Sequence, residues 1–111
     1  MVSRRERWVD VGSLERFAEQ AILAIRVEGV DLILVRDADN VFACERACPH
    51  EQADLCQGRV TEGRLFCPRH FAWFDLRDGR MSPGWPSRNL RCYPVRIENA
   101  RISIDAALLR A

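Results

Sequence analysis

Short runs of alternating hydrophobic and polar residues, separated by turn-forming dipeptides, extend along this chain of 111 residues. The runs at 21–27 and 31–36 flank Glu28-Gly29, a pattern typical of a β-hairpin. Further hairpins are predicted around Glu62-Gly63, Asp78-Gly79 and Glu98-Asn99. The predicted strands cover residues 7–11, 21–27, 31–36, 41–44, 59–61, 64–67, 71–76, 80–81, 91–97 and 101–105. Many short strands of this kind indicate an all-β fold, a small antiparallel β-sandwich or barrel.

Helical signals along the chain are brief. Ser13 is suited to cap one helical turn over residues 13–16, and only residues 106–110 show a further helical pattern. In the last hairpin, alternation predicts one buried face, formed by Tyr93, Val95, Ile97, Ile102 and Ile104. No repeat, low-complexity tract or linker interrupts the sequence. We therefore expect a single domain over residues 1–111.

The composition narrows the class of protein. Hydrophobic residues make up 48% and charged residues 30%, which is typical of a globular domain. A net charge of +1 gives no reason to expect binding to nucleic acid or to a membrane. Residues 1–10 are polar, so we expect no export signal. The apolar runs at 21–25 and 32–35 are far shorter than a membrane span of about 18 residues. We expect a cytoplasmic monomer.

Both histidines of the chain lie close to cysteines. The two groups are Cys48-x-His50 and Cys67-x-x-His70, and a proline follows each of these cysteines. They fall in two predicted loops, one after the strand that ends near Cys44 and one after the strand that ends near Phe66. Proline fixes φ and removes a backbone donor, so it stiffens a loop that holds ligands. The spacing therefore indicates a metal site clamped between two loops.

Four such ligands suit either zinc or an iron–sulfur cluster. Structural zinc sites usually pair cysteine with cysteine and histidine with histidine, whereas each pair here is mixed. Mixed pairs favour an asymmetric [2Fe–2S] cluster, in which one iron has two thiolate ligands and the other has two imidazoles. The five cysteines are an odd number, and with no export signal they argue against a disulfide framework.

The pattern C-x-H, sixteen residues, C-x-x-H resembles the motif of the Rieske [2Fe–2S] family. The stretch RHFAWFDLRDGRM is also similar to the family, with an aromatic at Phe74, the pair Asp75-Leu76 and a turn glycine at Gly79. The resemblance covers nearly the whole chain. It implies a Rieske fold, in which small antiparallel sheets carry a cluster-binding subdomain of two ligand loops. It also implies the ligand set Cys48, His50, Cys67 and His70.

The number of histidines and the residues between Cys67 and His70 distinguish the branches of this family. Rieske oxygenases need a second, mononuclear iron with two histidine ligands, but this chain has only the two histidines that the cluster uses. Respiratory Rieske proteins resemble one another in a disulfide between the ligand loops, with the motif C-x-C-H. Here Pro68 and Arg69 occupy the middle positions. The resemblance is therefore closest to the Rieske ferredoxins of ring-hydroxylating oxygenase systems.

That branch implies a one-electron carrier, not an enzyme with a substrate of its own. Its expected partners are a flavin-dependent ferredoxin reductase, which donates the electron, and a terminal oxygenase, which accepts it. Two alternatives remain open: a small Rieske subunit of another redox enzyme, such as a nitrite reductase, and a structural zinc-binding domain.

The sequence also predicts the environments of the other three cysteines and the role of one further loop. Cys44 and Cys92 lie in apolar strand patterns and are expected to be buried, inert thiols. Cys56 is expected to be a loop thiol near the cluster. The segment Ser82-Pro83-Gly84-Trp85-Pro86 resembles the third, proline-containing loop that covers the cluster in Rieske proteins.

Overall fold

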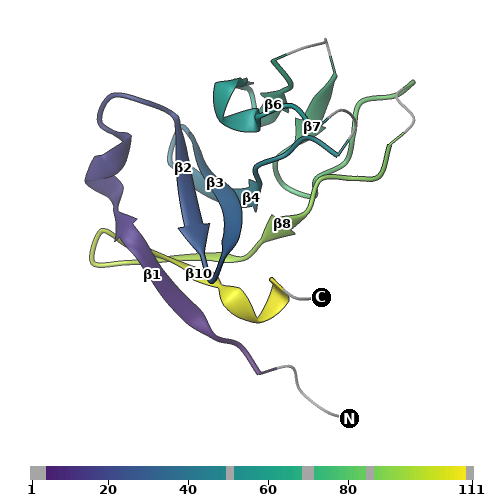
Figure 1. Ribbon diagram of the computed structural model, residues 1–111. Coiled ribbons are helices and arrows are strands. Elements are labelled where there is room, and N and C mark those ends of the chain that lie inside the picture. Colours follow the sequence, from purple (N-terminus) through teal and green to yellow (C-terminus); the bar gives the residue numbers. More distant parts are fainter. Residues whose placement is uncertain (1–4, 50–51, 69–71, 85–86, 110–111) are drawn as a thin grey trace.

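The computed structural model describes residues 5–49, 52–68, 72–84 and 87–109. Within these residues the fold consists of short antiparallel strands and single 3-10 turns (Figure 1), as the all-β prediction requires. The first sheet has the order β1-β10-β9, with bounds Trp8–Ser13, Arg101–Asp105 and Val95–Glu98. The second has the order β2-β3-β4-β8, with bounds Ile22–Val27, Val30–Asp37, Asn40–Glu45 and Cys92–Tyr93. The third has the order β5-β6-β7, with bounds Arg59–Thr61, Arg64–Phe66 and Trp73–Asp75.

Strand β3 lies between two hydrophobic cores. Its four central residues, 32–35, are fully buried, and alternate side chains point to opposite faces of the sheet. Leu32 and Leu34 pack against Ile102 and Ile104 of β10, in a core shared with the first sheet. Ile33 and Val35 pack into a second core with residues of the third sheet. The second sheet thus separates a structural base from the part of the molecule that carries the predicted ligand loops.

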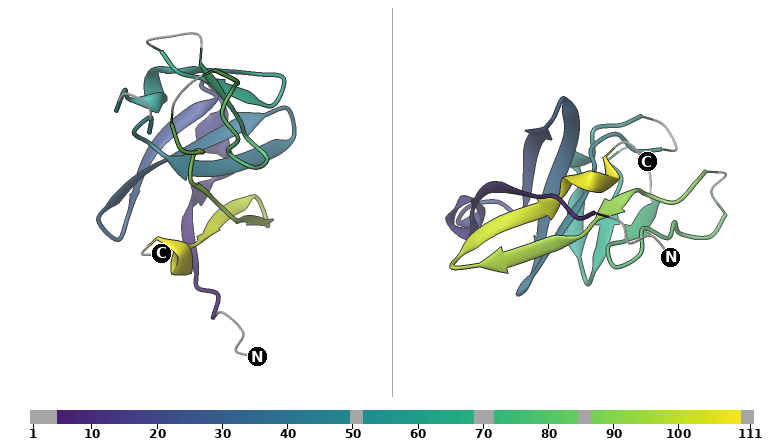
Figure 2. Two further views of the ribbon diagram at one scale, coloured as in Figure 1. Left: turned by 90° about the vertical axis from the view of Figure 1, so that its right-hand side faces the viewer. Right: turned by 90° about the horizontal axis from the view of Figure 1, so that it is seen from below.

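The third sheet and the loops next to it lie at the end of the molecule away from the N-terminus (Figures 1 and 2). Its inner face is apolar, because Leu65 and Phe74 are fully buried against the second core. Its outer face carries Arg59 of β5, Phe66 of β6 and Trp73 of β7, which are neighbours in the register of the sheet. The sheet therefore holds one ligand loop firmly on the core while its outer face remains accessible to solvent.

Most of the predicted turns are confirmed. Glu28-Gly29 and Glu62-Gly63 join their strands as two-residue turns, and all four residues have positive φ. The third such turn is one residue later than predicted, at Asn99-Ala100, because Glu98 pairs with Arg101 at the end of the ladder. The predicted strand at 80–81 is reduced to a single bridge between Phe74 and Met81.

The predicted strand at 91–97 is wrong as a single element. Pro94 divides it into β8, which pairs with β4, and β9, which pairs with β10. Proline has no N–H to contribute to a ladder, so the chain leaves one sheet at Pro94 and joins the other. The predicted buried face holds for Ile102 and Ile104, but Ile97 is 40% exposed because β9 is an edge strand.

The helical predictions are confirmed as 3-10 turns in the described residues. Ser13 caps η1 (Leu14–Phe17), and its hydroxyl accepts the Glu15 N–H at 3.1 Å. Asp105 caps η3 (Ala106–Leu108) in the same way. The remaining turn is η2 (Leu55–Gln57), which was not predicted. None of the helices described is long and apolar enough to span a bilayer.

Candidate metal centre

The first predicted ligand loop leaves the end of β4. Its cysteine, Cys48, is fully buried, and the Cys48 N–H donates to the carbonyl of Ala53 at 2.8 Å. The Gln52 N–H donates to the Cys48 carbonyl at 2.6 Å. These two hydrogen bonds close the loop around residues 49–52 and fix the direction of the Cys48 side chain. His50 lies outside the described residues, so its role as a ligand stays a prediction.

The second predicted ligand loop leaves the end of β6 and is closed by the same kind of bond. The Cys67 N–H donates to the carbonyl of Ala72 at 3.0 Å, again five residues further along the chain. Cys67 is 4% exposed and Ala72 is fully buried. His70 lies in sequence between the closing residues and is outside the described part of the chain. The two loops therefore have equivalent stems, which the sequence spacing alone did not reveal.

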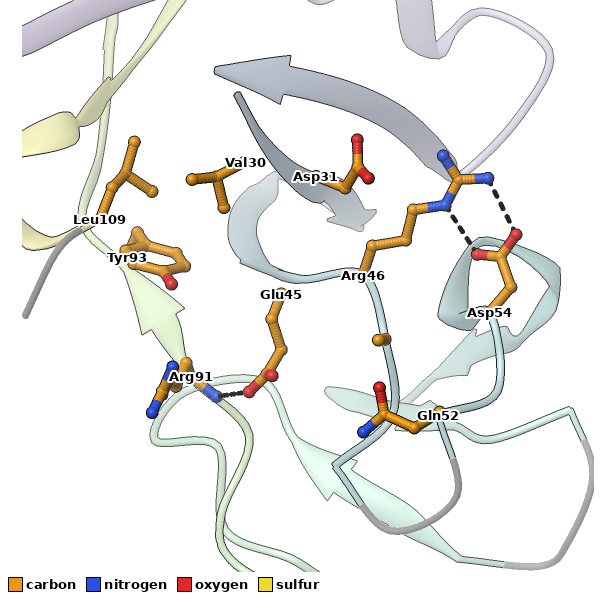
Figure 3. Close-up of a pocket in the computed structure, with 10 residues that line it drawn as sticks. Val30, Asp31, Glu45, Arg46, Gln52, Asp54, Arg91, Tyr93 and Leu109 are labelled. Atoms are coloured by element: carbon orange, nitrogen blue, oxygen red, sulfur yellow. Dashed lines mark hydrogen bonds and ion pairs between the residues drawn. The ribbon is translucent and has the colours of Figure 1, made fainter. Parts of the chain in front are cut away.

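An ion pair fastens the base of the first loop (Figure 3). The Arg46 guanidinium donates to both oxygens of Asp54, through Nε and Nη2, each at 2.9 Å. Asp54 also accepts the Cys56 N–H at 2.9 Å, and the Leu55 N–H donates to the Arg46 carbonyl. The hydrogen bonds from Arg46, aided by the Cys56 N–H and the Arg46 charge, lower the pKa of Asp54, so this carboxylate is ionised at neutral pH.

The two loops meet through the core beneath them. Cys48 and Cys67 belong to one buried apolar cluster, together with Leu55, Leu65 and Phe74. Gly58 allows the close approach of the first loop to β6, because a Cβ at this position would overlap the Phe66 carbonyl oxygen. The cysteines from two distant parts of the sequence are thus held on one side of the same core.

The start of the third predicted loop is bonded to the residue that follows the second. The Ser82 N–H donates to the Trp73 carbonyl at 2.8 Å, and the buried Ser82 hydroxyl accepts the Trp73 N–H at 3.1 Å. Pro83 and Gly84 follow on the surface, while Trp85 and Pro86 are outside the described residues. The covering role of this loop therefore stays a prediction, although its anchor lies next to the second ligand loop.

A cavity of about 430 Å³ lies beside the stem of the first loop (Figure 3). Glu45 and Arg46 line it from the end of β4, and Tyr93 lines it from β8. Glu45 is engaged, because it accepts two bonds from the Arg88 guanidinium and one from the Arg91 N–H. Burial raises the pKa of Tyr93. These bonds stabilise the stem and connect it to the segment that follows the third loop.

The residues that are described fit the thiolate half of a [2Fe–2S] site. Two buried cysteines on equivalent, closed loops face one apolar core, and a dry environment of this kind protects thiolate-bound iron. The donor set is completed in sequence by two imidazoles, one in each loop. Histidine in place of two thiolates is the ligation that defines a Rieske cluster.

The other three cysteines occupy different environments. Cys44 on β4 is fully buried, as predicted, whereas Cys92 on β8 is only partly buried. Cys56 lies in η2, next to the Arg46–Asp54 pair, and is also partly buried. The sequence did not reveal that Cys44 and Cys92 are opposite each other in the sheet, because β8 was not recognised as a partner of β4.

Comparison with known proteins identifies the class of site. The profile of the Rieske [2Fe-2S] domain family matches residues 7–94. The chain belongs to this family, and its cofactor is a Rieske-type [2Fe–2S] cluster.

Several relatives that match over almost their whole length are ferredoxin components. The ferredoxin component of a naphthalene 1,2-dioxygenase system from Pseudomonas aeruginosa is 32% identical over 90% of this chain and 96% of its own length. The anthranilate 1,2-dioxygenase ferredoxin subunit from Burkholderia cepacia is 32% identical over 88% and 91%. Among solved structures, the ferredoxin of carbazole 1,9a-dioxygenase from Nocardioides aromaticivorans IC177 has a TM-score of 0.79 and 28% identity, covering 88% of this chain and 96% of that one.

Proposed function

We propose that this protein is a one-electron carrier that accepts an electron from a flavin-dependent reductase and passes it to a terminal oxygenase. The observation that carries the proposal is the pair of buried cysteines, Cys48 and Cys67, on two loops with equivalent closing bonds. The ferredoxin relatives support this role, since they match almost the whole chain. We further propose that residues 1–111 act as a single domain, as a monomer and in the cytoplasm.

We assign the cluster ligands to four residues. Cys48 and Cys67 hold one iron in the buried core, and His50 and His70 hold the second. When bound, the cluster supplies a site that takes up and releases a single electron. The protein's own residues fix the cysteine positions through the closed loops and exclude water through the apolar core. Neutral imidazoles leave the site less negative than four thiolates would, which raises its potential.

The chain lacks the residues for oxygen activation of its own. A mononuclear iron site of the oxygenase type needs two further histidines, and the sequence contains only His50 and His70. The proposed role therefore ends with electron transfer to a partner.

We propose that partners dock at the end of the molecule that carries the ligand loops. Arg59 and Arg64 are exposed on the outer face of the third sheet, and their guanidinium groups stack on the rings of Phe66 and Trp73, at 5.0 and 4.1 Å from the ring centres. Asp75, opposite Arg64 in the register, is bonded to Arg77, so the face keeps an excess of positive charge. This face suits a partner surface rich in carboxylates.

Cofactor analysis and ligand variants test the function together. We expect purified protein to be red-brown, to contain iron and acid-labile sulfide in equal amounts, and to undergo reversible one-electron reduction with dithionite. Replacing any one of Cys48, His50, Cys67 or His70 with alanine should abolish the cluster and lower the unfolding midpoint, because metal binding contributes to folding.

The matched control is Cys56→Ser, which changes a cysteine beside the first loop that is not an assigned ligand and should keep the visible spectrum. A colourless protein with one zinc would overturn the proposed function. A His50→Ala variant with a full [2Fe–2S] spectrum would overturn the ligand assignment.

A further inference from the structure

Cys44 and Cys92 occupy directly opposite positions on the antiparallel strands β4 and β8. The Glu45 N–H donates to the Arg91 carbonyl at 3.0 Å, one residue beyond this pair on each strand. In an antiparallel ladder, a bond in that place makes the Cys44–Cys92 pair a non-hydrogen-bonded one, with Cα atoms about 4.5 Å apart. That separation lies within the range of roughly 4.4–6.8 Å that a disulfide bridges without backbone movement.

The two thiols are neighbours on the paired strands, and each shifts the pKa of the other. The Cys92 thiol donates to the Leu90 carbonyl oxygen at 3.7 Å. The interaction with Cys44 lowers the pKa of Cys92, whereas the interaction with Cys92 and burial raise the pKa of Cys44. Cys92 is thus the thiol of the pair that ionises more readily, which makes it the better nucleophile.

The pair is open to solvent on one side only. Cys44 is fully buried in β4, but Cys92 lines a cavity of about 410 Å³ together with Phe42, Leu76 and Pro94. A small oxidant can therefore reach Cys92 through this cavity, whereas Cys44 has no exposed surface. Cys92 is therefore the thiol that reacts first with an oxidant, and Cys44 reacts second.

We propose that Cys44 and Cys92 form a reversible disulfide when the protein meets a peroxide. The Cys92 thiolate attacks one peroxide oxygen, the O–O bond breaks, and the departing hydroxide takes up a proton to give water. Cys44 then loses its proton and attacks the resulting Cys92 sulfenic acid. The S–S bond forms, the S–O bond breaks and a second water leaves. Two thiols are oxidised by two electrons, and one hydrogen peroxide is reduced to two waters.

The bond would close residues 44–92 into one covalent loop. This segment contains Cys48, His50, Cys67 and His70, together with the third sheet, so the disulfide lies at the neck of the entire ligand-bearing subdomain. A cross-link at this point restricts the unfolded chain and stabilises the subdomain whether or not its cluster is bound. Its function is to preserve the ligand loops under oxidative conditions that remove the iron.

Peptide mapping of the holoprotein tests the proposal. Trypsin places Cys44 in peptide 37–46 and Cys92 in peptide 92–96, and neither peptide contains another cysteine. After treatment with a small excess of hydrogen peroxide, removal of the excess with catalase and alkylation under denaturing conditions, we expect these peptides to be cross-linked. Dithiothreitol should separate them. Recovery of both peptides fully alkylated, after the visible absorbance has been bleached, would overturn the proposal.

Two variants separate this role from general damage. Cys92→Ser should keep the [2Fe–2S] spectrum but lose the cross-link, whereas Cys56→Ser should form it as the wild type does. After oxidation and loss of iron, the wild type should unfold at a higher temperature than Cys92→Ser, and reduction should remove the difference. Equal midpoints before and after reduction would refute the stabilising role. A zinc-bound protein would overturn the proposed electron carrier and leave this cross-link intact.

Discussion

Cys48 and Cys67 show how a ligand loop is defined by backbone bonds as well as by the ligand itself. In each loop the cysteine N–H bonds to the carbonyl of an alanine five residues later, and both alanines are buried. The small side chains of Ala53 and Ala72 let the chain return close to the core. The C-x-H and C-x-x-H spacing is the basis of the predicted metal ligands, but it contains no sign of this common closure.

Gly79 is a residue-scale test of the turn that supports the second loop. Gly79 has φ +76°, its carbonyl accepts the Leu90 N–H at 2.8 Å, and a Cβ here would overlap the Leu90 carbonyl oxygen. Gly79→Ala should therefore lower the free energy of unfolding in two ways. The left-handed backbone costs about 1–2 kcal/mol, and the steric clash costs a further 1–3 kcal/mol or so. Chemical denaturation measures the loss.

Gly29→Ala is the matched control for this substitution. Gly29 has a similar φ of +81°, but nothing lies within 4 Å of the Cβ that alanine would add. This variant should show only the backbone cost, about 1–2 kcal/mol. If the two variants were equally stable, the close approach of Gly79 to Leu90 would not be a constraint on the fold.

At the scale of elements, the Arg46–Asp54 pair holds the two ends of the first ligand loop together. Asp54→Asn keeps an acceptor for the Cys56 N–H but loses the charge and one of the two bonds from Arg46. Because both side chains are 37% exposed, solvent screening limits the loss of stability to about 1 kcal/mol. The larger effect should be on cluster retention, since the loop opens more often. Loss of visible absorbance in the presence of an iron chelator measures it.

Asp10→Asn is a control with almost the same contacts in a different sheet. Asp10 accepts two bonds from Arg101 and one from the Gly12 N–H, two residues further along the chain. This variant should leave the rate of cluster loss unchanged, because β1 and β10 belong to the structural base. Equal acceleration in both variants would mean that the Asp54 contact has no specific role in the loop.

Both carboxylates also predict the direction of a pH effect on the wild type. The bonds from arginine lower the pKa of Asp10 and of Asp54. A lowered pKa in the folded state stabilises the fold above the ordinary aspartate pKa of about 3.9, and this contribution is lost as the pH falls through the lowered value. The stabilisation from these pairs should therefore be unchanged near neutral pH and decline only in acid.

The outer face of the third sheet predicts how charge affects electron transfer. Reversing two charges in Arg59→Glu/Arg64→Glu should slow oxidation of the reduced protein by the anion ferricyanide, by roughly three- to tenfold at low ionic strength. Oxidation by the cation hexaamminecobalt(III) should become faster. Both effects should decrease as salt is added. Stopped-flow absorbance measures the rates.

The control carries the same change of charge on the second sheet. Arg26 lies on β2 and Arg36 on β3, so both belong to the second sheet and not to the third. Arg26→Glu/Arg36→Glu should alter the two rates much less. Equal effects from the two double variants would place the important charge elsewhere than on the third sheet.

The elements show which parts of the fold were predictable. The turns at Glu28-Gly29 and Glu62-Gly63 were predictable, because a two-residue hairpin turn needs positive φ and glycine adopts it readily. The pairing of strands was harder to predict from the sequence. The change of sheet at Pro94 depends on which distant strand offers a free edge, and the Cys44–Cys92 contact follows from that pairing. The structure places Cys48 and Cys67 in one core, but all four ligand assignments stay predictions, and the two histidines lie outside the described residues.

At the scale of the whole molecule, the two hydrophobic cores contain different parts of the fold. The base core contains residues of β10 together with Leu32 and Leu34 of β3, whereas the second core contains both cysteines that are the predicted ligands. The four-stranded sheet lies between the two cores and packs Ile33, Val35 and Cys44 into the same core as the ligand-loop cysteines.

The redox potential is a whole-molecule property that the sequence and the fold together predict. Rieske centres range from about −150 to +300 mV, and hydrogen bonds to the sulfurs are one of the factors that set a potential. The residues after His70 are Phe71, Ala72 and Trp73, which have no hydroxyl group. Arg69 adds a positive charge next to a ligand, but screening by water reduces its influence. We therefore expect a midpoint at the low end of the range, roughly −150 to −100 mV. Such a potential suits a carrier reduced by a flavin and unable to oxidise a quinol. Protein-film voltammetry at neutral pH measures it, and a midpoint above zero would place the protein with the quinol-oxidising branch instead.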